Sequence, residues 1–376
     1  MSVYKLTYLE VRVRKSLGVL AGIGAVSLVL AACGSTPDDG GATTAAPSPT
    51  DTTAAPSPVL PPVKACMISD AGGFDDRSFN ETAFLGLEAA KAEYGIETLA
   101  LESGSDADYQ PNINQAIQQD CSLVITVGFL LGDATEAAAT ANPSVDFSIV
   151  DYAYEAPPEN LQGLVYATEQ SSFVAGYLAA GMTETGTVGT YGGIPIPSVT
   201  SFMSGFYQGV QYYNEAKGTD VEVLGWDPTD PEKGTYAGGF DDQNQGKQIA
   251  KNFIQQGADI IFPVAGPVGL GSAAEAQAND GVSIIWVDTD GCISASQYCD
   301  VFLTSVMKGI DASVKASIGA VVDGTFSNEL YVGTLANGGT KIAPYNEFDA
   351  AVPAELKAEV EQVTADIISG TITVTP

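Results

Sequence analysis

Short apolar runs alternate along the chain with longer segments in which apolar residues recur at helical spacing. In the first part of the chain this pattern predicts strands at 63–68, 96–101, 123–127 and 147–150. It predicts helices between them at 78–94, 109–119 and 134–141. Strands that alternate with helices in this way form a parallel sheet with helices on both faces.

The same alternation of strands and helices begins again after a short apolar run at 164–166 and a helix rich in Ala and Gly at 172–182. The predicted strands are 187–191, 221–226, 259–262 and 283–287. The predicted helices are 199–215, 243–256 and 272–279. The sequence therefore predicts two α/β lobes of one architecture.

The last part of the chain is predicted to return to both lobes. We expect strand 301–304 and helix 311–322 in lobe one, and strand 330–332 and helix 354–368 in lobe two. The predicted fold is a type I periplasmic-binding-protein fold, with a ligand cleft between the lobes and a hinge of several crossings. Its predicted boundaries are 63–168 and 292–328 for lobe one, and 169–291 and 329–376 for lobe two.

The N-terminus has the pattern of an export signal. A basic region up to Lys15 precedes an apolar stretch, 17–32, which ends in L-A-A-C at Cys33. The apolar stretch falls short of the ~20 residues that a membrane-spanning helix needs. We therefore predict a lipoprotein signal peptide at 1–32, lipidation of Cys33, and a flexible tether at 33–62 that is rich in Thr, Ala, Pro and Ser.

Composition excludes several kinds of chemistry. The 376 residues carry a formal net charge of −31, so nucleic acid and anionic membrane surfaces are poor partners. The absence of histidine excludes Ser-His and Cys-His pairs and histidine metal ligands. Beyond the signal peptide the only arginine is Arg77, which disfavours amino acids and nucleotides because guanidinium groups commonly hold such anions.

Four cysteines follow Cys33, an even number in a chain that is predicted to leave the cytoplasm. Cys66 lies in the first strand and Cys121 just before the third, so the two can meet if these strands are neighbours. Cys292 and Cys299 bracket a six-residue loop. We predict two disulfides. The alternative is a zinc site, but zinc ligands usually lie closer together along the chain than these four cysteines do.

Polar residues concentrate where predicted strands end. The stretch 67–84 passes from a strand through Gly72 and Gly73 into a helix, which Ser78 is predicted to cap together with Glu81. In an open α/β sheet such a turn lies beside the ligand crevice. A carboxylate, an aromatic face and an amide are therefore expected at one site, from Asp70, Phe79 and Asn80.

Further acids follow two other strands. Asp151 ends one strand, and Asp288 and Asp290 follow another; each can accept hydrogen bonds from ligand hydroxyls or can cap a helix. The D-T-D-G segment lacks the later spacing of an EF-type calcium loop. The segment from Gly269 to Ala274 resembles G-x-G-x-x-A, but close approach of a helix N-terminus to the cleft explains it better than a dinucleotide. No metal, cofactor or catalytic residue is predicted.

The stretch S-D-A-G-G-F-D-D-R-S-F-N-E resembles the first motif of the basic membrane protein family, substrate-binding lipoproteins of ABC importers that include purine nucleoside receptors. Later motifs agree in order, among them V-G-F-L-L-G-D-A, F-P-V-A-G, W-V-D-T-D and T-S-V-M-K. The likeness spans roughly residues 63–370. Departures at Gly291 and at 263–267 leave the base preference open.

This resemblance implies a nucleoside pocket. The matching positions are Asp70, Phe79, Asp151, Asp288 and Lys308, with Phe202 and Gly266 added by later motifs. Phe202 could equally pack in the core. Lys308 is implied to bond a ribose oxygen or a carboxylate of the cleft.

The sequence thus predicts a monomeric, lipid-anchored capture protein on the extracytoplasmic face of the cell membrane. It would bind nucleosides, most favourably purine nucleosides, and deliver them to the permease and ATPase subunits of an ABC importer, without catalysis or a cofactor. The alternatives are a sugar receptor, an exported nucleoside hydrolase that uses its Asp cluster, and a sensor subunit.

Overall fold

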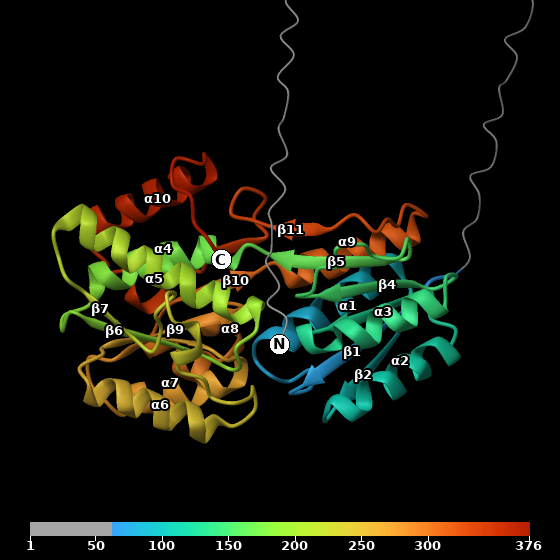
Figure 1. Cartoon of the computed structure of the whole chain (residues 1–376), viewed down its shortest axis with the longest axis horizontal. Coiled ribbons are helices and arrows are strands. Elements are labelled where there is room, and N and C mark those ends of the chain that lie inside the picture. The colour runs from blue at the N-terminus through green and yellow to red at the C-terminus, as the bar shows by residue number, and fades with distance from the viewer. Residues whose placement is uncertain (1–61) are drawn as a thin grey trace, which may run out of the picture. The chain divides into compact units, whose positions relative to one another are not determined.

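A computed structural model describes residues 62–376. The predicted signal peptide, the predicted lipidation site Cys33 and all but the last residue of the predicted tether lie outside the described residues. The described chain forms two six-stranded sheets, each with helices on both faces (Figure 1). This arrangement agrees with the predicted fold class of two α/β lobes.

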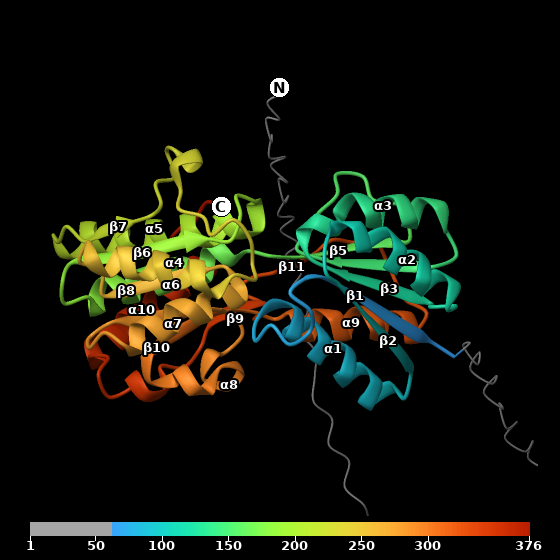
Figure 2. The ribbon, with the colours of Figure 1, turned by 90° about the horizontal axis from the view of Figure 1, so that it is seen from below.

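The first sheet has the strand order β11-β5-β4-β3-β1-β2, and all its pairs are parallel. Helices α1 and α9 cover one face of this sheet, and α2 and α3 cover the other (Figure 2). Adjacent residues of β1 face opposite sides, so Met67 packs with α1 and α9 while Ile68 packs with α2 and α3. The strands are β1 (Lys64–Ala71), β2 (Glu97–Ser103), β3 (Leu123–Val127), β4 (Asp146–Val150), β5 (Leu161–Tyr166) and β11 (Tyr331–Gly333). The helices are α1 (Phe79–Tyr94), α2 (Tyr109–Gln118), α3 (Gly132–Ala141) and α9 (Ile310–Val322).

The second sheet repeats this order as β12-β10-β9-β8-β6-β7, with only β12 antiparallel to its neighbour. One face packs against α4, α5 and α10, and the other against α6 and α7. The strands are β6 (Thr187–Gly192), β7 (Glu222–Leu224), β8 (Ile260–Val264), β9 (Ser283–Asp288), β10 (Phe302–Lys308) and β12 (Thr340–Ile342). The helices are α4 (Thr168–Met182), α5 (Pro197–Lys217), α6 (Gln243–Gln255), α7 (Gly269–Gln277), α8 (Gly291–Ser294) and α10 (Ala354–Ile368).

Two strand assignments from the sequence are wrong. The run at 301–304, expected in lobe one, begins β10, which lies between β9 and β12 in the second sheet. The run at 330–332, expected in lobe two, forms β11 at the edge of the first sheet beside β5. The buried pattern of β10 requires neighbours on both sides, whereas a three-residue strand such as β11 suits an edge. Local pattern alone does not tell which sheet offers either position.

The chain crosses between the sheets three times within residues 62–376, after β5, β10 and β11. The crossings are joined by backbone hydrogen bonds. Ala167 N donates to Gly333 O at 2.7 Å, and Gly309 N donates to Gly339 O at 2.9 Å. Adjacent segments of this kind, in which a few backbone torsions can change, are the usual form of a hinge between two lobes.

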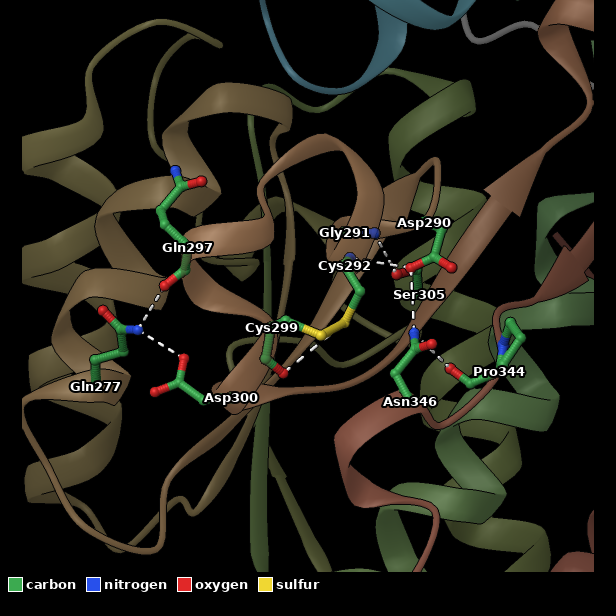
Figure 3. Close-up of a disulfide and its surroundings, with 10 residues drawn as sticks. All are labelled: Gln277, Asp290, Gly291, Cys292, Gln297, Cys299, Asp300, Ser305, Pro344 and Asn346. Carbon is green, nitrogen blue, oxygen red and sulfur yellow. Dashed lines mark hydrogen bonds between the residues drawn. A yellow bond between two sulfur atoms is a disulfide. The ribbon is translucent and has the colours of Figure 1, made fainter.

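Both disulfides connect the cysteines that the sequence pairs. Cys66 of β1 joins Cys121, which precedes the neighbouring strand β3, with Cα atoms 5.9 Å apart. Cys292 joins Cys299 with Cα atoms 4.6 Å apart and closes the loop that contains α8 (Figure 3).

Candidate functional site

A cavity lies at the carboxyl ends of strands from both sheets, where the sequence analysis places the ligand crevice. It contains about 590 Å³ of empty space, including space open to solvent. Only a small part of this space is wide enough for a water molecule, so the cavity is narrow. All eight predicted ligand-binding residues line it: Asp70, Phe79, Asn80, Asp151, Phe202, Gly266, Asp288 and Lys308.

Asp76 determines how the chain enters α1. Its carboxylate accepts hydrogen bonds from three backbone N–H groups, those of Ser78, Asn80 and Glu81, at 2.9 to 3.0 Å. An anion with two oxygens can serve several N–H groups at a helix N-terminus and also interacts favourably with the helix dipole. The predicted capping box is therefore wrong, because the Ser78 side chain makes no cap bond.

Asn80 is oriented by two carboxylates. Its Nδ2 donates to Asp70 Oδ1 at 2.9 Å and to Asp76 Oδ2 at 3.3 Å. Its Oδ1 is buried and has no hydrogen-bond partner among the described residues. Because buried acceptors are usually paired, this oxygen is available to a donor on a ligand.

Burial alters the acids around Asn80. Removal from water disfavours the charged form and raises the pKa of Asp70 to about 7, an effect that the Asn80 hydrogen bond partly offsets. Burial likewise raises the pKa of Asp76 to about 6, although the hydrogen bonds from three backbone N–H groups act to lower it. Both carboxyl groups therefore titrate between mildly acidic and neutral pH.

Asp151 and Asp288 occupy equivalent places in the two lobes. Asp151 follows β4 and Asp288 ends β9, and these strands hold the same position in their sheets. Both residues have left-handed backbone conformations, with φ of 68° and 67°. Such values are uncommon for residues other than glycine, although aspartate adopts them more readily than most, and they concentrate at functional sites.

Lys308 lies between these two acids. Its Nζ is 2.6 Å from Asp151 Oδ2 and 3.4 Å from Asp288 Oδ1, and only 5% of the residue is exposed. Burial works against the ammonium charge, but the two carboxylates outweigh it and raise the pKa of Lys308. Burial raises the pKa of Asp151, and Lys308 limits that rise.

Two aromatic rings from different lobes flank the same ammonium. Lys308 Nζ lies 4.9 Å from the ring centroids of both Phe79 and Phe202. Phe202 is fully buried and also packs edge-to-face on Phe262, so its core and cavity roles coexist. The cavity thus combines flat apolar faces with oxygen acceptors, an arrangement that suits a neutral ligand with one planar part and several hydroxyl groups.

Two predicted features serve the scaffold instead. Asp290 is absent from the cavity lining; its Oδ1 accepts a hydrogen bond from Cys292 N at 3.0 Å and caps α8 (Figure 3). A Cβ on Gly271 would lie 1.8 Å from Gln243 O, so this glycine allows α7 to pack closely on α6. The prediction that Gly271 allows the helix N-terminus to approach the cleft is therefore wrong.

Sequence reasoning missed several cavity residues. Asp76, Phe240 and Ile196 line the cavity, as do Phe129 and Leu130. The last two follow β3 after Gly128, and their place after a strand end is the signal that could have identified them. Phe240 lies in a long loop after β7, where no strand end marks its position, although it belongs to a Y-A-G-G-F-D-D motif at 236–242.

Two α/β lobes with a cavity between their strand ends define a protein of the periplasmic-binding fold class. An ABC transporter solute-binding protein from Aeropyrum pernix K1 matches with a TM-score of 0.75 and 25% identity, over 84% of this chain and 94% of its own. An arabinose-binding protein from Geobacillus stearothermophilus shares the fold with a TM-score of 0.55 and 15% identity, over 78% of this chain and 100% of its own.

Sequence comparison identifies the family. Residues 63–375 match the family described as "ABC transporter substrate-binding protein PnrA-like", and the chain belongs to it. The "ABC transporter nucleoside-binding protein BmpA" of Lactococcus lactis is 32% identical over 83% of this chain and 89% of its own. "Basic membrane protein A1" of Borrelia garinii is 29% identical over 83% of this chain and 88% of its own. The protein is thus an ABC transporter substrate-binding protein and not an enzyme.

Two features are absent from the described part of the chain. Within residues 62–376, no helix is long and apolar enough to cross a membrane. The same residues contain no group of three or more Cys, Asp or Glu side chains placed to hold a metal ion.

Proposed function

We propose that this protein captures nucleosides, with purine nucleosides as the preferred ligands, and delivers them to the permease and ATPase subunits of an ABC importer. The single observation that carries the proposal is the pairing of flat apolar faces with acceptor groups in one narrow cavity. Phe79 and Phe202 supply the faces, and Asp288 and the free oxygen of Asn80 supply acceptors. The name of the Lactococcus lactis relative supports the same ligand class.

Each part of a nucleoside has a group to recognise it. A base would stack on Phe79, because any planar ring can contact a phenyl face. The ribose hydroxyls would donate to Asp288, because an ionised carboxylate only accepts hydrogen bonds. Lys308 would hold Asp151 and Asp288 in place, since its ammonium already contacts both.

Calorimetric titration with inosine and with ribose tests this proposal. Inosine should bind and ribose should bind far more weakly, because ribose lacks the base. Preference for ribose would make the protein a sugar receptor, and binding of neither would end the proposal. Mass spectrometry of ligand carried through native purification would identify the preferred base.

We also propose that Cys33 carries the lipid anchor on the extracytoplasmic face and that the protein acts as a monomer. The support is the L-A-A-C end of the apolar N-terminal stretch. Cys33→Ala should release the protein from the membrane fraction. Unchanged fractionation of this variant would contradict the anchor.

A further inference from the structure

Ser78 connects the two lobes beside the cavity. Its Oγ donates a hydrogen bond to Asp288 Oδ2 at 2.8 Å and lies 3.3 Å from Val287 O. Ser78 precedes α1 on the first sheet, whereas both partners belong to β9 of the second sheet. Ser78 is fully buried, and Asp288 is only 4% exposed.

The Ser78 hydroxyl has no part in starting its own helix. The cap of α1 is provided by Asp76, and the remaining bonds of Ser78 to α1 run from its backbone carbonyl, which accepts from Thr82. Both recorded partners of the hydroxyl therefore lie on the opposite lobe. Removal of this hydroxyl should leave α1 and the first sheet intact.

This contact depends on lobe closure. A 2.8 Å hydrogen bond between residues of different lobes must break when the lobes separate, whereas the bonds of Asp76 and Asn80 within lobe one persist. An interaction made in only one of two states shifts the population toward that state. The negative charge of the Asp288 carboxylate also strengthens the hydrogen bond from Ser78.

We propose that Ser78 is a positioning residue that orients Asp288 and holds the lobes closed around the ligand. The assignment of Asp288 to the ribose rests on the proposed function, but the closing role of Ser78 does not. A carboxylate can accept about four hydrogen bonds. The bond from Ser78 to Oδ2 therefore fixes the carboxylate plane and leaves acceptor capacity for ligand hydroxyls.

The test compares Ser78→Ala with Ser272→Ala. Ser272 is an equally buried serine, but among residues 62–376 its hydroxyl bonds only Tyr191 and Gly246, which both belong to the second lobe. Stopped-flow kinetics with inosine should show that Ser78→Ala releases the ligand about tenfold faster than the wild type, while the association rate is nearly unchanged. The loss of one charge-assisted hydrogen bond corresponds to a roughly tenfold loss of affinity. Ser272→Ala should dissociate like the wild type.

A second arm needs no ligand. Small-angle scattering of the ligand-free protein should give a larger radius of gyration for Ser78→Ala than for the wild type and Ser272→Ala, because the closed state has lost a contact. If inosine does not bind the wild type, the proposed function fails, and this arm alone decides the role of Ser78. Unchanged radius in Ser78→Ala, or unchanged dissociation where inosine binds, would overturn the proposal.

Discussion

The Lys308 ammonium lies 2.6 Å from the Asp151 carboxylate, although Lys308 ends a strand of the second sheet and Asp151 follows a strand of the first. The ion pair therefore spans the lobes at the cavity. Lys308 also approaches Asp288, so one buried cation compensates two buried anions. The consequence of losing it is asymmetric: removal of this one cation leaves two buried carboxylates without a compensating positive charge.

Lys308→Met should destabilise the protein strongly. Removing one partner from a buried ion pair costs about 3–5 kcal/mol of unfolding free energy, because the remaining charge is left uncompensated. Urea denaturation followed by circular dichroism measures this loss. The matched control is the double variant Lys308→Met/Asp151→Asn, which should recover part of the stability. Equal losses in the single and double variants would contradict the ion-pair argument.

Ribose and base should be recognised by different residues. Asp288→Asn should weaken inosine binding at least about tenfold more than 2′,3′-dideoxyinosine binding, since a hydrogen bond to a charged group is worth about 1.5–3 kcal/mol. Phe79→Ala should weaken both ligands nearly equally, because stacking ignores the ribose. Calorimetric titration of the four combinations provides the comparison. Equal losses for both ligands in Asp288→Asn would remove this residue from ribose recognition.

The cavity should discriminate against phosphate. Among its lining residues in the described chain, Lys308 is the only cation, against Asp70, Asp76, Asp151 and Asp288. Inosine should therefore outcompete its 5′-monophosphate in a competition titration, because the added negative charge is repelled. High salt should narrow the difference by screening the part of the repulsion that reaches solvent. Similar affinities at low salt would rule out the electrostatic explanation.

Stability should decrease as pH rises toward neutrality. Asp70 has a pKa of about 7 in the folded protein, against an ordinary value of 3.8, so the folded state binds more protons between about pH 4 and pH 7. Asp76 acts in the same direction up to about pH 6. Stability from these protons is complete below pH 4 and is lost as pH rises through the folded-state pKa values.

Thermal unfolding at pH 5 and pH 8 tests this linkage. Asp70→Asn cannot ionise, so it should reduce the loss of melting temperature between the two pH values. Asp75→Asn is the matched control, because Asp75 lies in the same loop with 82% of its side chain exposed. A pH dependence in Asp70→Asn that equals the wild-type dependence would contradict the burial effect on Asp70.

The position of the eight predicted residues at the cavity could be anticipated because the sequence carries two independent signals for them. Strand ends in an open α/β sheet lie beside the crevice, which identifies Asp70, Asp151 and Asp288. The family motifs add residues such as Phe202, whose burial pattern alone would indicate only core packing. Both signals are local in the chain, so the position of these residues at the cavity could be predicted without knowledge of distant contacts.

Predictions failed where a neighbouring residue competed for the same hydrogen bonds, or where the true partner lies far away in the sequence. Ser78 has a good capping side chain, but Asp76 lies two residues before it and provides the stronger acceptor. The hydroxyl of Ser78 is then free for Asp288, which lies 210 positions further along the chain. The places of β10 and β11 depend likewise on strands far away in sequence.

The crossing of the chain back into the first lobe also determines when that lobe can fold. Its core includes Ile310, Val314 and Ile318 of α9, which pack with Met67 and Leu87 from the start of the domain. A nascent chain that has emerged only to β10 lacks these residues, and its first lobe exposes an apolar face beside α1. The first lobe therefore cannot complete its core during synthesis until the whole second sheet except β12 has been made.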